Sequence, residues 1–135
     1  MMRSAIKLIA GIALLALTPA YAASDREARG EAELAKAIEG RTAGEPVKCL
    51  NTRDIRSTRV IDRTAILYEM RGGTIYVNKP ESGARQLDRW TALVTRTSSP
   101  QLCDVDIVRL YDTTANMETG SVSLGRFVPY RKSRG

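Results

Sequence analysis

The sequence predicts a mainly β (α+β) fold: a small antiparallel β-sandwich or barrel-like domain preceded by one N-terminal helix. The chain has 135 residues, of which 43% are hydrophobic and 27% charged, so its composition is that of one folded domain. Only the segment near residues 24–38 has a long run of good helix formers with helical spacing. From residue 47 onward, short β-type runs alternate with turn residues.

Residues 1–22 have the composition of an export signal. A basic start with Arg3 and Lys7 precedes the apolar run Leu8–Leu17, and the small-residue triplet Ala20-Tyr21-Ala22 follows. The apolar run is much shorter than the roughly 20 residues that a membrane-spanning helix needs. We therefore expect cleavage after residue 22 and a periplasmic or secreted mature chain without a permanent membrane span. The alternative is an uncleaved anchor.

Residues 23–46 are expected to form the N-terminal helix and a linker. Ser24-Asp25-Arg26-Glu27 has the spacing of a capping box, which places the start of the helix at Ser24. Leu34, Ala35 and Ile38 provide only a thin apolar stripe, so the helix should pack lightly on the domain. Gly40 can end the helix in the left-handed conformation, and the polar linker follows.

Residues 47–130 should form the β domain, and residues 131–135 a basic tail that frays. The predicted strands are Val47–Asn51, Thr58–Ile61, Ala65–Met70, Thr74–Asn78, Ala92–Arg96, Val105–Tyr111 and Ser121–Val128. Leu87, Trp90 and Leu93 are three residues apart, which predicts one helical turn before the fifth of these strands.

Gly72-Gly73 predicts a tight hairpin, because two glycines suit the positive φ angles of a two-residue turn. That turn would place Tyr68 opposite Val77. Directly paired residues share a sheet face. The expected buried face consists of Ile66, Tyr68, Met70, Ile75 and Val77, and the expected exposed face includes Glu69, Arg71 and Thr74.

Cys49 and Cys103 are the only cysteines, and in an oxidising compartment an even number of cysteines predicts a disulfide. Closing a loop of about 55 residues stabilises a fold by about 4 kcal/mol in the chain-entropy model. A redox-active pair would favour the closer C-x-x-C spacing, and a zinc site normally takes four ligands. We therefore predict a structural bond that staples the β domain.

Arg53, Arg56, Arg59 and Arg63 place four guanidinium groups within eleven residues. With a net charge of +6, the chain could use this cluster to bind phosphates, lipopolysaccharide-type anions or acidic polysaccharide. Acidic residues are interleaved and few aromatics accompany the cluster, so nucleic acid is not an expected partner. The competing interpretation is a solvated charged edge that prevents strand-to-strand association.

The chain has no histidine, which excludes Ser-His-Asp and Cys-His catalysis and imidazole metal ligands. Asp104 and Asp106 are candidates for calcium binding or for acid/base glycoside cleavage. No glycine-containing loop rich in Asp and Asn surrounds them, which favours a cap or turn role. Ser121 and Ser123 lack the G-x-S-x-G pattern of a serine nucleophile. We predict no metal and no cofactor.

Five short motifs occur in order along residues 31–130. They are Gly44-x-Pro46-Val47-x-Cys49-Leu50, Arg59-Val60-Ile61-Asp62, Tyr76-Val77-Asn78, Leu102-Cys103-x-x-Asp106 and Leu124-Gly125-x-Phe127. In this order the sequence resembles a proteobacterial family of small exported proteins of unknown function. Members often carry two further cysteines, at positions that correspond to Ala84 and Val122 here, so this chain has two of the usual four. The resemblance implies export and implies no activity.

The sequence as a whole predicts a non-enzymatic binding or interaction module of the envelope or periplasm. Its expected partner is an envelope protein or an anionic envelope component. The alternative hypothesis is a small hydrolase that uses Asp104 or Asp106. A concave pocket that contains both carboxylates would favour the hydrolase, whereas a flat apolar or arginine-lined face would favour the binding module.

Overall fold

A computed structural model describes residue 11 and residues 21–133 of the chain. The expected export signal, residues 1–22, lies largely outside these residues, as do residues 134–135 of the expected tail. Among the helices of the described residues, none combines the length and the apolar character that a membrane crossing requires.

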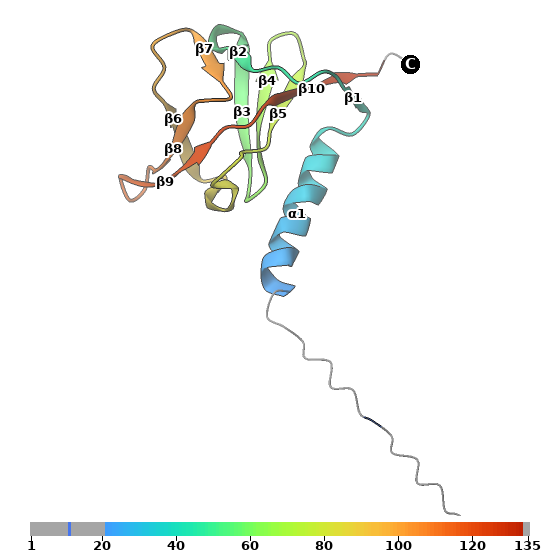
Figure 1. The fold of residues 1–135 in the computed structure, drawn as a ribbon, viewed down its shortest axis with the longest axis vertical. Coiled ribbons are helices and arrows are strands. Elements are labelled where there is room, and N and C mark those ends of the chain that lie inside the picture. Colours follow the sequence, from blue (N-terminus) through green and yellow to red (C-terminus); the bar gives the residue numbers. More distant parts are fainter. Residues whose placement is uncertain (1–10, 12–20, 134–135) are drawn as a thin grey trace, which may run out of the picture.

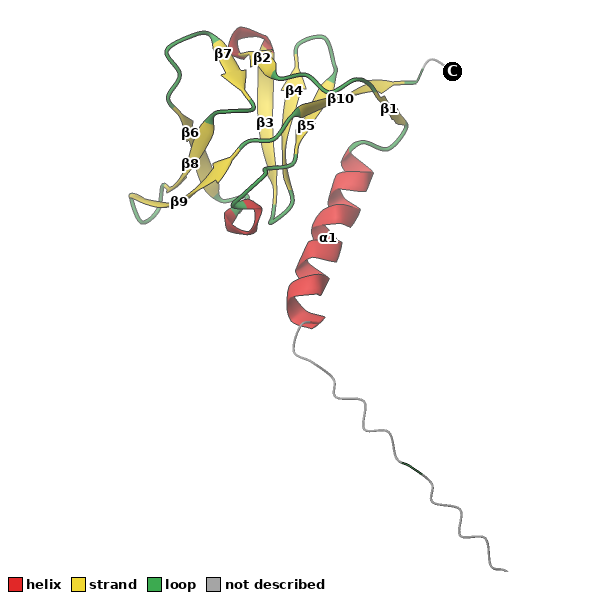
Figure 2. Ribbon diagram, in the orientation of Figure 1, coloured by secondary structure: helices red, strands yellow, loops and turns green. Residues whose placement is uncertain are grey.

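The fold is mainly β with one N-terminal helix, as predicted (Figure 1 and Figure 2). The helix α1 spans Tyr21–Ala37 and so begins before the expected start at Ser24, because tyrosine and alanine can continue a helix. The strands are β1 (Arg41–Ala43), β2 (Cys49–Asn51), β3 (Ile55–Ile61), β4 (Ala65–Met70), β5 (Ile75–Asn78), β6 (Thr91–Thr95), β7 (Gln101–Cys103), β8 (Ile107–Asp112), β9 (Met117–Ser123) and β10 (Phe127–Lys132). Two short 3-10 helices are η1 (Thr52–Asp54) and η2 (Ala84–Gln86).

The strands form three antiparallel sheets in a sandwich-like domain. The first sheet has the order β1-β10-β5-β4-β3, the second has the order β6-β8-β9, and β2 pairs with β7 in the third. The strand β3 is therefore an edge of the five-stranded sheet, and β6 is an edge of the three-stranded sheet. No sequence pattern predicted β7, which is short and follows a Ser-Pro loop.

The five-stranded sheet is buried on both faces. One face contributes to a core that includes Val60, Ile66, Tyr68, Leu110 and Phe127. The other face contributes to a second cluster that consists of Leu34, Ile61, Ala65, Leu67 and Val77. Leu34 comes from α1, and within residues 25–37 of this helix only Leu34 and Gly30 are buried. The helix thus packs lightly on the domain, as its sequence predicted, but Ala35 of the predicted stripe is exposed.

The β4–β5 hairpin turns through three residues rather than the predicted two. The N–H of Met70 donates to the carbonyl oxygen of Thr74 at 2.9 Å, so Arg71, Gly72 and Gly73 form the loop. Of the two glycines, Gly73 alone has a positive φ, of 92°. This arrangement matches a three-residue hairpin loop, in which one glycine takes the left-handed position.

The longer loop shifts the hairpin register by one residue. Tyr68 pairs with Tyr76 instead of Val77, and Glu69 pairs with Ile75. Because successive side chains point to opposite faces, the shift moves Ile75 and Val77 to the cluster under α1, away from Tyr68. The predicted single buried face is therefore wrong. The alternation of apolar and polar side chains could not reveal the register, because both faces of β4 and β5 carry apolar residues.

Three other segments differ from the expected boundaries. The expected linker contains β1, which pairs with the end of β10, so Arg131 and Lys132 belong to a sheet rather than to a frayed tail. The expected strand Ser121–Val128 is divided between β9 and β10. Leu87 is buried whereas Trp90 is 82% exposed, and the helical turn lies earlier, in η2.

Candidate functional site

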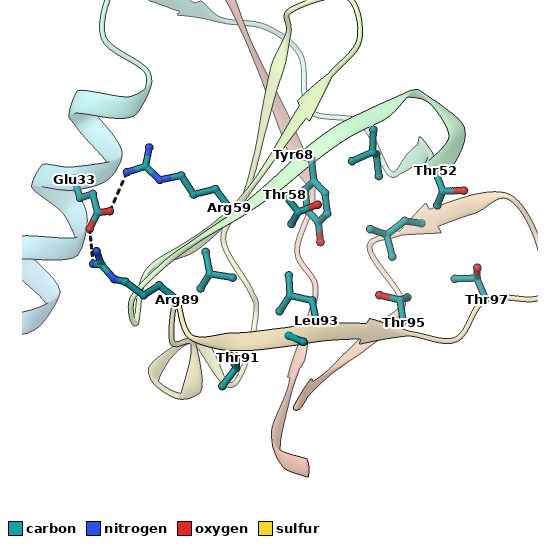
Figure 3. Close-up of a pocket in the computed structure, with 14 residues that line it drawn as sticks. Glu33, Thr52, Thr58, Arg59, Tyr68, Arg89, Thr91, Leu93, Thr95 and Thr97 are labelled. Atoms are coloured by element: carbon teal, nitrogen blue, oxygen red, sulfur yellow. Dashed lines mark hydrogen bonds and ion pairs between the residues drawn. The ribbon is translucent and has the colours of Figure 1, made fainter. Parts of the chain in front are cut away.

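A cleft of about 800 Å³ opens between β3 and β6 (Figure 3). Its volume is in the range of small-molecule pockets. Apolar side chains such as Val60 and Leu93 line the cleft together with the hydroxyl groups of Thr58, Tyr68 and Thr95. The cleft therefore presents an apolar wall with hydrogen-bonding groups along it.

An ion-pair network lies at one end of the cleft, between α1, β3 and the segment before β6 (Figure 3). Glu33 accepts from Arg59 at 2.9 Å and from Arg89 at 3.1 Å. Arg89 also contacts Asp62 at 2.9 Å. The hydrogen bond and charge of Asp62, together with the charge of Glu33, raise the pKa of Arg89. The network thus positions both guanidinium groups at the cleft.

Tyr68 forms the inner wall of the cleft. It is 4% exposed, its ring packs edge-to-face on Phe127 at a centroid distance of 5.7 Å, and its hydroxyl points toward β6 (Figure 3). Burial raises the pKa of this phenol, so the group is a neutral hydrogen-bonding partner at physiological pH. The cleft can bind and orient a ligand, but its described lining holds no pair of free acid and base.

The four arginines of the sequence cluster do not converge on one site. Arg53 lies in η1, Arg56 and Arg59 lie on β3, and Arg63 lies in the β3–β4 turn with a φ of 58°. Arg59 is paired with Glu33, whereas the buried Nε of Arg63 has no hydrogen-bond partner among the described residues. Charged side chains along an edge strand such as β3 also hinder its pairing with a strand of another molecule.

A second pocket, of about 470 Å³, lies between α1 and the β3–β4 turn. Five arginines and three acidic residues line it, namely Arg26, Arg29, Arg63, Arg85, Arg89, Glu33, Asp62 and Asp88. One member of the predicted cluster, Arg63, therefore lies beside arginines that are distant in the sequence. This basic pocket shares Glu33 and Arg89 with the end of the cleft.

The candidate catalytic carboxylates lie away from both pockets. Asp106 accepts the backbone N–H of Cys103 at 2.7 Å, and Asp104 lies 4.0 Å from the guanidinium of Arg126. Neither residue lines the cleft or the basic pocket. In the part of the chain that the structure describes, no three His, Cys, Asp or Glu side chains gather as metal ligands would. Asp106 has the turn-capping role that the sequence favoured.

The predicted disulfide between Cys49 and Cys103 is confirmed. These residues are direct partners in the β2–β7 pair, with Cα atoms 4.0 Å apart. The neighbouring Leu102 is buried and contributes to the lining of the cleft. The disulfide thus joins β2 to β7 and fixes the strand that contributes Leu102 to the cleft.

The fold and the cleft define a class: a small disulfide-stapled β protein with a ligand-sized cleft between two sheet edges. No family model, curated protein sequence or solved structure matches this chain.

Sequence reasoning did not identify the cleft. Its lining comes from α1, β3, β4, β6 and β7, which are far apart in the chain. One local signal was present: Thr91, Leu93, Thr95 and Thr97 alternate along one stretch, so hydroxyl and apolar side chains share one strand face. All four residues line the cleft.

Proposed function

We propose that this protein is an exported, non-enzymatic binding module and that the cleft between β3 and β6 is its ligand site. The observation that carries the proposal is the lining of the cleft, which combines an apolar wall with threonine and tyrosine hydroxyls in about 800 Å³. A general acid or base must lie within hydrogen-bond reach of the group whose proton it transfers, so catalysis at the cleft needs such groups in its lining. Asp104 and Asp106 lie elsewhere, and Asp106 is engaged with a backbone N–H.

Two observations support an exported location. The Cys49–Cys103 bond is typical of oxidising compartments, and residues 1–22 have the pattern of a signal peptide. The cleft is partly apolar, which suits a protein segment better than a polyanion. An anionic envelope component is the alternative partner, and the basic pocket beside α1 would be its site.

The test is retention of envelope molecules by cleft variants. The mature chain is immobilised, incubated with native envelope extract, and analysed by mass spectrometry for bound proteins and small molecules. Leu93→Trp fills the cleft, whereas Val94→Trp places the same side chain on the opposite, exposed face of β6. We expect species that the wild type and Val94→Trp retain and that Leu93→Trp loses. Equal retention by all three proteins would contradict the proposal.

A further inference from the structure

We propose that the occupant of the cleft is an extended peptide that adds a strand to β3. This inference rests on the proposed function and specifies its ligand class. Its starting point is that the cleft lies between two sheet edges: β3 pairs only with β4, and β6 pairs only with β8. Within residues 21–133, β3 and β6 do not pair as strands.

The direction of the free backbone groups follows from the hairpin geometry. The N–H of Met70 donates across the β4–β5 hairpin, so in β4 the backbone groups of Leu67 point the other way, toward β3. Leu67 pairs with Arg59 on β3, so the backbone groups of Arg59 must point toward β4. Backbone groups alternate in direction along a strand, so the N–H and C=O groups of Thr58 and Val60 point away from β4. Both residues also line the cleft.

The lining has the properties that strand addition requires. Unpaired N–H and C=O groups of an edge strand recruit another backbone, and side-chain pockets then select alternate residues of the incoming strand. Val60 and Leu93 offer apolar surface for such residues, and Thr58 and Thr95 offer hydroxyls. The shorter edge, β6, has five residues, which is close to the mean length of a strand. A peptide of about five residues would thus span the cleft.

The charged side chains of the cleft lie at its α1 end (Figure 3). Arg59 and Arg89 are both paired with Glu33, and Arg89 is also paired with Asp62, so the formal charges of this network balance. Charge at this end therefore does not select a peptide of either sign, and the unpaired backbone groups of β3 carry the recognition.

The experiment uses random heptapeptides displayed on phage and selected on the immobilised mature chain. The strongest binder is synthesised, and its affinity is measured by fluorescence anisotropy. We expect Leu93→Trp to abolish binding and Val94→Trp to retain it. Methylation of single peptide nitrogens should weaken binding about tenfold at alternate positions only, because alternate N–H groups of an added strand pair with β3. Hydrogen exchange should show protection of the Thr58 and Val60 amides when the peptide binds.

A second pair of variants tests the backbone group itself. Thr58→Pro removes the outward N–H, and Thr58→Val keeps it while removing the hydroxyl. We expect about a tenfold loss of affinity for Thr58→Pro relative to Thr58→Val. Spectroscopic unfolding curves serve to check that both variants fold.

The outcomes separate this inference from the proposed function. If a peptide binds in the cleft without alternating sensitivity and without amide protection, strand addition is wrong and the cleft is still a ligand site. If no selected peptide depends on Leu93, the peptide class is wrong, and cleft-dependent retention of a polysaccharide or small molecule from envelope extract would identify another class. The proposed function itself is contradicted only if Leu93→Trp retains the same envelope molecules as the wild type.

Discussion

Asn78 is a fully buried polar residue whose side chain joins β5 to the loop before β10. Its Nδ2 donates to the carbonyl oxygen of Gly125 at 2.7 Å, and its Oδ1 accepts the N–H of Gly125 at 2.9 Å. A Cβ at position 125 would overlap the carbonyl oxygen of Lys79, so only glycine fits. Two of the short sequence motifs, one around Asn78 and one around Gly125, thus meet as a structural clasp.

Replacing Asn78 by alanine should destabilise the protein by about 2–4 kcal/mol, because two buried backbone groups of Gly125 lose their partner. Urea unfolding measures this difference. The matched control is Asn51→Ala, at an exposed position, where the loss of one hydrogen bond to Arg53 should cost about 1 kcal/mol or less. Equal losses for the two variants would contradict the role of the clasp.

Tyr68 should make the fold less stable in alkaline solution. Burial raises the pKa of its phenol above the ordinary value near 10. Below that value the phenol is protonated in both states and contributes no pH dependence. Above it, the unfolded chain releases a proton that the folded chain keeps, so the free energy of unfolding should fall by up to about 1.4 kcal/mol per pH unit. Unfolding curves from pH 9 to 11 should show a smaller slope for Tyr68→Phe, and identical slopes would contradict the expectation.

At the scale of the element, the β4–β5 hairpin shows how a turn sets the faces of two strands. Gly73 has a φ of 92°, and no atom of the described residues outside its chain neighbours lies within 4 Å of a Cβ at Gly72 or Gly73. Space is therefore no obstacle at either position, and backbone conformation alone distinguishes them.

Gly73→Ala should destabilise the protein by about 1 kcal/mol, because alanine is strained at positive φ. Gly72→Ala should be neutral or stabilising by a few tenths of a kcal/mol, because it lowers the entropy of the unfolded chain. Chemical denaturation compares the two. A two-residue turn with both glycines at positive φ would make both variants costly, so a similar loss for Gly72→Ala would contradict the observed register.

The helix α1 docks where its backbone can approach the β3–β4 turn. At Gly30, a Cβ would overlap the hydroxyl of Thr64 and lie 2.9 Å from the carbonyl oxygen of Asp62. Exposed ion pairs add to the docking, among them Lys79 with Glu31 at 3.1 Å. Such pairs are each worth about 1 kcal/mol or less, so the close approach at Gly30 and the burial of Leu34 are the main determinants of helix position.

Gly30→Ala should loosen α1 from the domain even though alanine favours helix more than glycine does. Limited trypsin digestion should then cleave after Arg29 several times faster than in the wild type. Ala32→Gly is the matched control, because it lowers helix propensity at an exposed position without approaching Thr64. Slower cleavage of Gly30→Ala than of the wild type would show that propensity, and not docking, controls the helix.

At the scale of the whole molecule, the disulfide connects the N-terminal and C-terminal halves of the β domain. Cys49 and Cys103 are separated by 54 positions, and β7 has only three residues with which to pair. The bond therefore restricts a large part of the unfolded chain.

The double variant Cys49→Ala/Cys103→Ala should lose about 4 kcal/mol of stability by the chain-entropy estimate. Reduction of the wild type should produce a loss of similar size, which excludes an effect of the alanines themselves. Urea unfolding with and without reductant measures both. Unchanged stability after reduction would contradict a stabilising role for the bond.

Features that depend on neighbours in the chain could be predicted from the sequence. Good helix formers with a thin apolar stripe predicted α1, and the run Ala65–Met70 coincides with β4. The cysteine count, together with the expected export of the chain, predicted the disulfide, because only one pairing was possible. The change from helical to β-type patterning predicted the fold class. Each of these inferences uses residues within one segment or a pairing without alternatives.

Features that depend on what packs against a segment were decided only by the tertiary structure. Alternation in β4 and β5 could not show that α1 covers one face and the other sheets cover the second, so the hairpin register required both contacts. The cleft is a stronger case, because Glu33, Thr58 and Leu93 reach it from three separate elements. A strand's periodicity records that a face is buried, but not which partner buries it. The site exists where two sheet edges approach without pairing, and that spacing is set by the whole core.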